Sequence, residues 1–180
     1  LSTTLAILLS GISHMIETTH KTNGRVAVVV PHGVLFRGGT EGNIRQKLIE
    51  ENLLDAVVGL PANLFFGTGI PAVILVFKRQ KADQRVLFID ASNDLASGTN
   101  QNYLREKDIE KIVTIYRARK GVKKYANLVD FNSIKENDFN LNIARYIDTF
   151  EAEPLVNIRP LNIEIKSVRR KLISIEAKMD

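Results

Sequence analysis

Residues 60–79, LPANLFFGTGIPAVILVFKR, combine an aromatic pair, a glycine-containing turn and a long apolar run. The run at residues 72–77 is rich in Val and Ile, and a proline and two basic residues bound it. Such a run predicts a strand buried on both faces. Phe65 and Phe66 stand just before it, next to the turn formed by Gly67, Thr68 and Gly69. These two rings could be core side chains or a platform for a planar ligand.

Three more short β-branched runs surround this stretch, at residues 25–31, 55–60 and 86–89. The first is typical of a parallel strand covered on both faces. A helical pattern at residues 41–52 separates the first two runs, which predicts a βαβ unit with a right-handed crossover. No helix separates the strand at 55–60 from the strand at 72–77, so we expect these two to be antiparallel neighbours. The prediction is an α/β fold whose mostly parallel sheet ends in an antiparallel hairpin.

Helical spacing of apolar residues also predicts helices at residues 5–19 and 103–119. The second would carry Ile109, Ile112, Val113 and Tyr116 on its apolar side. Polar, turn-rich sequence precedes it, and residues 131–148 are predicted to be irregular.

Basic residues outnumber acidic ones between Arg105 and Lys124. A solvated helix face explains this excess more simply than a nucleic-acid contact does. If DNA is bound here, the candidates for contact with its backbone are Lys120, Lys123 and Lys124.

From Leu161 onward, apolar side chains recur at spacings of four and three, which is the pattern of a heptad seam. We expect this coiled-coil-like helix, at residues 151–180, to dock on a partner helix. The seam consists of Leu161, Ile165, Val168, Leu172, Ile175 and Met179.

The composition of the 180 residues, 44% of them hydrophobic, suits one domain with a substantial core. The chain has no cysteine, which excludes disulfides, thiolate metal sites and a cysteine nucleophile. A chain without cysteine fits the reducing cytoplasm, where we expect the protein to be. No apolar run is long enough to cross a bilayer, so we expect no membrane partner. A net charge of +5 is compatible with a polyanionic partner.

The three histidines, His14, His20 and His32, lack the spacing of a metal-ligand cluster, so we expect no metal site. His32 follows a predicted strand, where it could be functional or merely structural. The motif Gly67-Thr68-Gly69-Ile70-Pro71-Ala72 matches G-x-G-x-x-A, but it contains a proline and opens a strand instead of a helix. We therefore reject a dinucleotide-binding role for it.

Several segments in order carry a resemblance to a known family. They are NGRVAVVVPHGVLFRGG, TEGNIRQKLIEENLLDAVVGLPANLFFGTGIPAVILVFKR, VLFIDAS and NDFNLNIARYIDTF. Together they resemble the modification subunit of type I restriction-modification systems, an N6-adenine DNA methyltransferase that uses S-adenosylmethionine. The resemblance spans about residues 24–150.

The resemblance implies that two motifs of the family are missing. The glycine-rich cofactor loop has no counterpart in this sequence. The catalytic Asn-Pro-Pro-aromatic motif is also absent, because all five prolines are isolated. The chain also begins at Leu1 without an initiator methionine. We therefore expect the C-terminal portion of such a subunit, without catalytic residues of its own and inactive alone.

The resemblance further implies a division into three parts. Residues 1–92 would be the C-terminal half of a Rossmann-like methyltransferase domain, and residues 93–150 a helical and irregular extension. Residues 151–180 would be the helix that docks on the specificity subunit, in a complex that also holds a restriction subunit and DNA. Phe65 best matches the aromatic that stacks on the flipped adenine, with Phe66 second.

A different class of function stays open, a non-catalytic module for protein interaction. The strand at residues 25–31 would lack its parallel neighbour and leave an open apolar edge. Such a module would assemble through this edge and the heptad helix, and the chain would associate with itself.

Overall fold

The computed structural model describes residues 2–148 and Arg169. The chain divides into two units, Leu1–Thr149 and Phe150–Asp180, and all the elements below belong to the first. The helices and strands follow one another as α1 (Ser2–Thr18), β1 (Arg25–Pro31), η1 (His32–Leu35), α2 (Thr40–Glu50), β2 (Leu54–Gly59), β3 (Ala72–Lys78), β4 (Val86–Asp90), β5 (Ala96–Ser97), β6 (Asn102–Tyr103), α3 (Glu106–Ala118), β7 (Ala126–Val129), α4 (Phe131–Glu136) and η2 (Ile143–Arg145).

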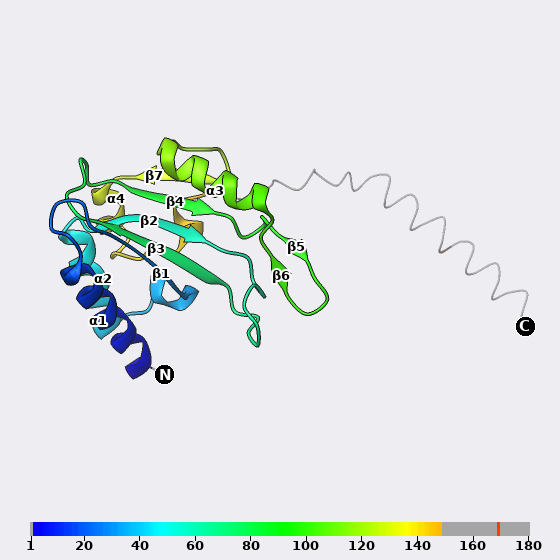
Figure 1. Cartoon of the computed structure of the whole chain (residues 1–180), viewed down its shortest axis with the longest axis horizontal. Helices are drawn as coiled ribbons and strands as arrows, with labels where there is room; N and C mark the ends of the chain where they lie inside the picture. Colours follow the sequence, from blue (N-terminus) through cyan, green and yellow to red (C-terminus); the bar gives the residue numbers. More distant parts are fainter. Residues whose placement is uncertain (1, 149–168, 170–180) are drawn as a thin grey trace, which may run out of the picture. The chain divides into compact units, whose positions relative to one another are not determined.

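A five-stranded sheet in the order β1-β3-β2-β4-β7 forms the centre (Figure 1). Strand β3 is antiparallel to both β1 and β2, which confirms the predicted hairpin at residues 55–77. The prediction of a mostly parallel sheet is wrong, because only the pairing of β2 with β4 is parallel. Strands β1 and β2 do run in the same direction, but β3 lies between them. Burial on both faces gives the same β-branched pattern in an antiparallel strand as in a parallel one.

Helices cover the sheet on both sides (Figure 1). Alternate residues of β3 face the two layers. Val73, Leu75 and Phe77 belong to the core cluster that includes residues of α1, α2, α4 and η2. Ala72, Ile74 and Val76 belong to a second cluster, which includes residues of α3. The central sheet is therefore buried between two helical layers.

Strand β1 differs from its prediction, since it is not covered on both faces. Val30 is buried, whereas Val29, which faces the other way, is 49% exposed. Within the described residues β1 pairs only with β3, so it lies at an edge of the sheet. An edge strand needs one apolar face only, which is why its burial alternates.

The region after β4 contains more structure than its sequence predicts. The polar segment at residues 94–102 includes part of a small hairpin, β5–β6, and β7 adds an antiparallel strand beside β4. Residues 131–148, predicted to be irregular, contain α4 and η2. Within α3 the residues that pack on the sheet include Ile112 and Tyr116, but Ile109 is 48% exposed, contrary to prediction.

The predicted docking seam, Leu161, Ile165, Val168, Leu172 and Ile175, lies outside the described residues. Its role and the division of the chain at residues 92 and 150 stay predictions. Among the described helices, none combines the length and the apolar character needed to cross a membrane.

Candidate substrate-base site

Several residues that the sequence singles out lie at one end of the strands, the edge of the sheet that runs across the strand ends. Strands β1, β2 and β4 end at this edge, and the antiparallel strands β3 and β7 begin there. The loop between β2 and β3 leaves the sheet at this edge, on the right in Figure 1. The carboxyl ends of strands are where open α/β sheets place their ligand sites.

Phe65 lies in a tight turn of the β2–β3 loop. The amide of Thr68 donates a hydrogen bond to the carbonyl of Phe65 at 3.3 Å, and Gly67 has a φ of +77°. A positive φ at the third residue of a turn is the feature that favours glycine there. The hydroxyl of Thr68 accepts a bond from the amide of Ile70 at 3.2 Å, which carries the chain back towards β3. The glycine turn thus sets the direction in which the preceding ring leaves the backbone.

The ring of Phe65 contributes to an apolar cavity of about 220 Å³ between the loop and the end of β1. The ring is 42% exposed, so it is neither core nor fully solvated. The cavity is lined by Val29, Val30, Pro31, Phe65, Thr68, Ile70, Pro71 and Ala72. A half-exposed aromatic beside an apolar hollow is chemically suited to receive a planar ring.

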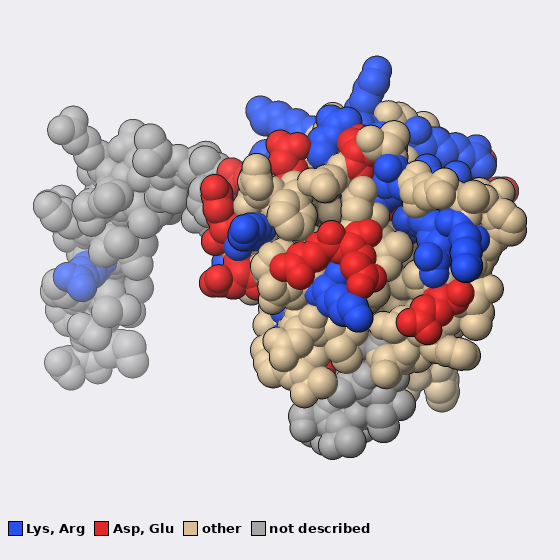
Figure 2. Space-filling model, turned by 90° about the vertical axis from the view of Figure 1, so that its left-hand side faces the viewer, with Lys and Arg blue, Asp and Glu red and all other residues tan. Residues whose placement is uncertain are grey.

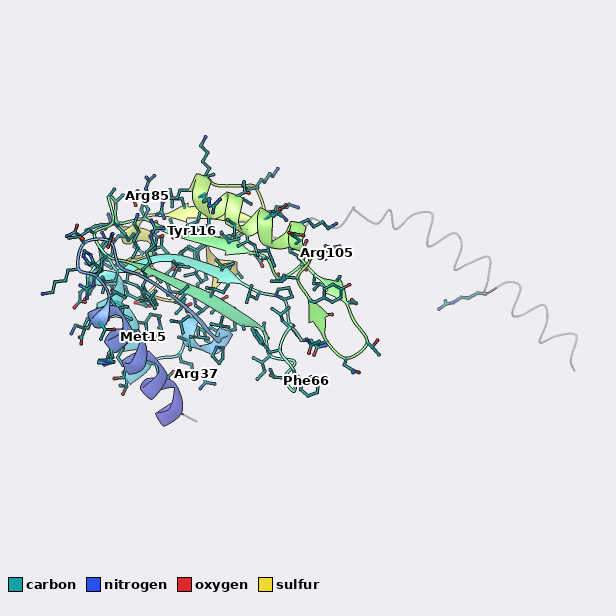
Figure 3. The ribbon with its side chains drawn as sticks, in the orientation of Figure 1. Met15, Arg37, Phe66, Arg85, Arg105 and Tyr116 are labelled. Carbon is teal, nitrogen blue, oxygen red and sulfur yellow. The ribbon has the colours of Figure 1, made fainter. Side chains whose placement is uncertain are left out.

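Phe66 is placed differently from its neighbour. It is 86% exposed and lies at the outer end of the loop, away from the sheet (Figure 3). It does not line the cavity, and neither do the exposed glycines Gly67 and Gly69. The structure therefore separates the two aromatics, which the sequence left together.

His32 begins η1 at the end of β1 and is half-buried. Its amide donates to the carbonyl of Pro71 at 3.2 Å, and its ring meets Phe36 edge to face at 5.6 Å. Burial lowers the pKa of His32 below its usual value, while the negative charge of Asp90 acts in the opposite direction. Burial therefore favours the neutral form of this imidazole. His32 does not line the Phe65 cavity. It is linked to the cavity by the hydrogen bond from its amide to Pro71, which does line it.

The lysine-bearing loop between α3 and β7 also reaches this edge. The amide of Asp90, the last residue of β4, donates to the carbonyl of Tyr125 at 2.8 Å. Lys123 and Lys124 line a second cavity of about 450 Å³, and Lys120 is exposed nearer α3. Three strand spacings of about 4.8 Å put this end of β7 roughly 14 Å from β3. Lys123 and Lys124 therefore share this edge with Phe65 without touching it. Lys120 follows Arg119, which binds Asp55 at the start of β2 and the carbonyl of Arg85 before β4, so it lies towards the opposite edge.

The opposite edge of the sheet faces the viewer in Figure 2. Lys and Arg side chains gather along its upper rim, while Asp and Glu side chains lie lower and among other basic groups. The C-terminal end of α3 reaches this side at the top of Figure 1, and Arg85 of the β3–β4 loop lies on the same side in Figure 3. The basic residues on this side therefore come from more than one element.

Sequence reasoning missed a contact that holds the Phe65 loop. The side chain of Asn102 on β6 donates to the carbonyl of Ala62 at 2.9 Å, and its amide donates to the carbonyl of Asn63 at 2.7 Å. The contact joins residues about forty positions apart, and no local pattern in a polar, turn-rich segment signals it.

The lining of the Phe65 cavity does not by itself suit S-adenosylmethionine. Among the described residues, no group of three or more His, Cys, Asp or Glu side chains could hold a metal ion. A nucleoside is usually held through its ribose by a carboxylate at the end of a strand. None of the described residues that line the Phe65 cavity is acidic.

Comparison with known proteins adds a family to this geometry. Residues 9–154 match the family model described as N-6 DNA Methylase. The methylase subunit of the type I restriction enzyme MpnII from Mycoplasma pneumoniae is 35% identical over 158 residues, which cover 87% of this chain and 29% of that protein. The corresponding MjaVIII subunit from Methanocaldococcus jannaschii is 33% identical over 158 residues, with coverage of 84% and 27%.

Solved structures agree with these relatives. The methyltransferase subunit of a type I restriction-modification system from Streptococcus thermophilus superposes with a TM-score of 0.69 at 50% identity, covering 71% of this chain and 27% of that one. The EcoKI M protein, at 19% identity and a TM-score of 0.64, supports the fold alone. The chain spans little more than a quarter of the length of the MpnII and MjaVIII methylase subunits. The family model covers most of the chain, from α1 through η2, and on that match the chain belongs to the N-6 DNA methylase family.

Proposed function

We propose that this chain is part of the modification subunit of a type I restriction-modification complex, which methylates adenine at N6 in DNA. Family membership and the type I methylase relatives support this function. The methyl donor would be S-adenosylmethionine, held by residues outside those described, and the Asn-Pro-Pro-aromatic motif would also come from outside this chain.

The observation that carries the proposal is the position of Phe65. Its ring is 42% exposed and borders an apolar cavity at the edge where strands β1 and β2 end. An adenine inside a duplex cannot present its amino group to a methyl donor, so it must be flipped out and held in a pocket. A flipped adenine would stack on Phe65, and such stacking is worth about 1–3 kcal/mol per base.

Two other surfaces would serve the same function. Lys123 and Lys124 would contact the DNA backbone from the same edge of the sheet as Phe65, and Lys120 from further along the same loop. The heptad seam around Leu172 would dock on the specificity subunit. A Leu172→Asp substitution would then weaken subunit assembly before it affects the methyl transfer itself.

The test replaces Phe65 in the complete methyltransferase complex that contains this chain. The F65A variant should assemble normally but methylate its site roughly 5- to 150-fold more slowly, the range that corresponds to one lost stacking contact. The matched control is F66A, because Phe66 is its neighbour but lies outside the cavity. Normal methylation by F65A would overturn the stacking role, and loss of assembly would indicate a structural role.

A second function is favoured by one observation, the open edge of β1. Among the described residues no strand pairs with its outer side, and Val29 is 49% exposed. The 180-residue chain would then associate with itself through this edge. Light scattering at high concentration should detect oligomers that V29K reduces and that T99K, a charge added in the exposed β5–β6 turn, does not. A monodisperse monomer would contradict this function.

A further inference from the structure

The β5–β6 hairpin and the β2–β3 loop lie side by side at the same end of the sheet (Figure 1). Asn102 joins them with two hydrogen bonds, from its amide to the carbonyl of Asn63 at 2.7 Å and from its side chain to the carbonyl of Ala62 at 2.9 Å. Both acceptors belong to the backbone just before Phe65. The hairpin therefore binds the backbone of the loop two and three residues before the aromatic ring of Phe65.

The hairpin itself is firmly held. Its turn is closed by a bond from the amide of Gly98 to the carbonyl of Gln101, and a side chain at position 98 would come within 2.5 Å of that carbonyl oxygen. Strand β6 then leads through Leu104, which packs on the core, into α3. Arg105 at the start of α3, labelled in Figure 3, binds Asp108 at 2.7 Å in a capping box. Asn102 is thus connected to α3 through residues that are hydrogen-bonded or packed on the core.

The loop, by contrast, depends on outside support in its first half. Asn63 has a φ of +55°, a left-handed conformation that few residues other than glycine and asparagine adopt readily. Among the described residues, the hydrogen bonds that reach residues 62–64 from outside the loop both come from Asn102. Phe65 itself and all residues to Ile70 are exposed. Leu64 packs against the core just before Phe65. The two bonds from Asn102 fix the backbone that leads into this contact.

We propose that Asn102 is a positioning residue, which holds the carbonyls of Ala62 and Asn63 so that Phe65 faces its cavity. The role rests on the proposed function, in which Phe65 stacks on the flipped base. Asn102 does not contact the base. It lowers the disorder of the loop before binding, so that less ordering is needed when the base arrives.

A fluorescence experiment tests the hold on the loop without any catalysis. The chain contains no tryptophan, so F65W places a single reporter at the site. In this background N102D keeps the shape of the side chain but removes its donor. The control N100D adds the same charge to the same hairpin at an exposed residue. We expect N102D to lose indole anisotropy and to gain accessibility to acrylamide, and N100D to leave both unchanged.

The same pair of variants is then measured in the complete methyltransferase complex. One lost hydrogen bond predicts a roughly three- to tenfold slower methylation for N102D than for N100D. Because Asn102 acts through Phe65, N102D should cause no further loss in an F65A background. A purely structural role would instead lower the melting temperature and slow both backgrounds equally. If N102D unfolds, the pair N102A and N100A replaces it.

The outcomes separate the two proposals. If N102D and N100D give the same indole signal, the positioning role is wrong, whatever the activity. If the indole is released by N102D but F65A methylates normally, Asn102 holds the loop and the stacking role of Phe65 fails. If F65A is slow and N102D matches N100D in rate, stacking stands and the positioning role is overturned.

Discussion

The hydroxyl of Tyr116 on α3 donates a hydrogen bond to the buried carboxylate of Asp55 on β2, across 2.6 Å. Arg119 binds the other oxygen of the same carboxylate at 2.7 Å. Burial, together with the bond to Asp55, raises the pKa of Tyr116 to about 12. Tyr116 lies where α3 meets the sheet in Figure 3. These contacts fasten α3 to the sheet, and α3 in turn supports the hairpin that carries Asn102.

Removing the carboxylate should therefore be costly. D55A leaves a buried hydroxyl and a guanidinium without their acceptor, which should lower the free energy of unfolding by about 3 kcal/mol or more. Y116F removes one bond and should cost about 1 kcal/mol. Urea denaturation of the 180-residue chain measures both. The control D130A, at an exposed aspartate without a side-chain cap bond, should stay within about 0.5 kcal/mol of wild type. An equally small effect for D55A would contradict this account of α3.

Local patterns in the sequence predicted the main helices and strands but not how the strands pair. The run at residues 72–77 forms a central strand because the apolar side chains on both of its faces must be buried by other elements. Which strands lie beside it depends on contacts between distant residues, and β-branched composition carries no such information. The short strand β7 was missed because four residues are too few to show a period.

The candidate site was predictable in the same limited sense. The aromatic pair next to a glycine turn marked the loop, but only the folded loop distinguishes the half-exposed Phe65 from the outward Phe66. Asn102 could not be found, because its acceptors are backbone carbonyls about forty residues away. Contacts of this kind depend on topology instead of residue type.

His32 predicts a specific dependence of stability on pH. Burial lowers its pKa in the folded state below the ordinary 6.5, so the folded chain binds this proton less readily than the unfolded chain. Its contribution is fully present above the unfolded pKa and is lost as the pH falls through the folded pKa. Between about pH 7.5 and about pH 5, H32N should lose less stability than wild type.

The matched control for His32 is the exposed His14. Denaturation curves of H14N at both pH values should parallel those of wild type. If H32N and H14N lose stability equally on acidification, burial of His32 does not influence the pH profile.

The lysines of the α3–β7 loop predict how DNA binding depends on salt. In the complete complex, replacing Lys120, Lys123 and Lys124 by Gln should weaken DNA binding and flatten the plot of log affinity against log salt. The slope should change by about 0.9 for each lost phosphate contact. A control triple, K21Q/K47Q/K135Q, removes equal charge from exposed positions on other elements. Identical slopes for the two triples would make the loop lysines a solvated face only.

The absence of the cofactor and catalytic motifs from the sequence predicts inactivity of this chain alone. We expect no methyl transfer to DNA by the 180-residue chain and no tight binding of S-adenosylmethionine. Isothermal titration with S-adenosylmethionine checks this directly. A titration with micromolar affinity or better, at about −8 kcal/mol, would mean that these residues form a cofactor site after all.

The stacking of the target base on Phe65 is tested most directly with 2-aminopurine at the adenine that is methylated. Fluorescence is measured for DNA bound to the complete complex, with wild type, F65A and F66A compared at saturation. A flipped base that stacks on Phe65 should be quenched in wild type and in F66A, and its emission should rise in F65A. Equal emission from all three complexes would contradict the proposed contact between Phe65 and the base.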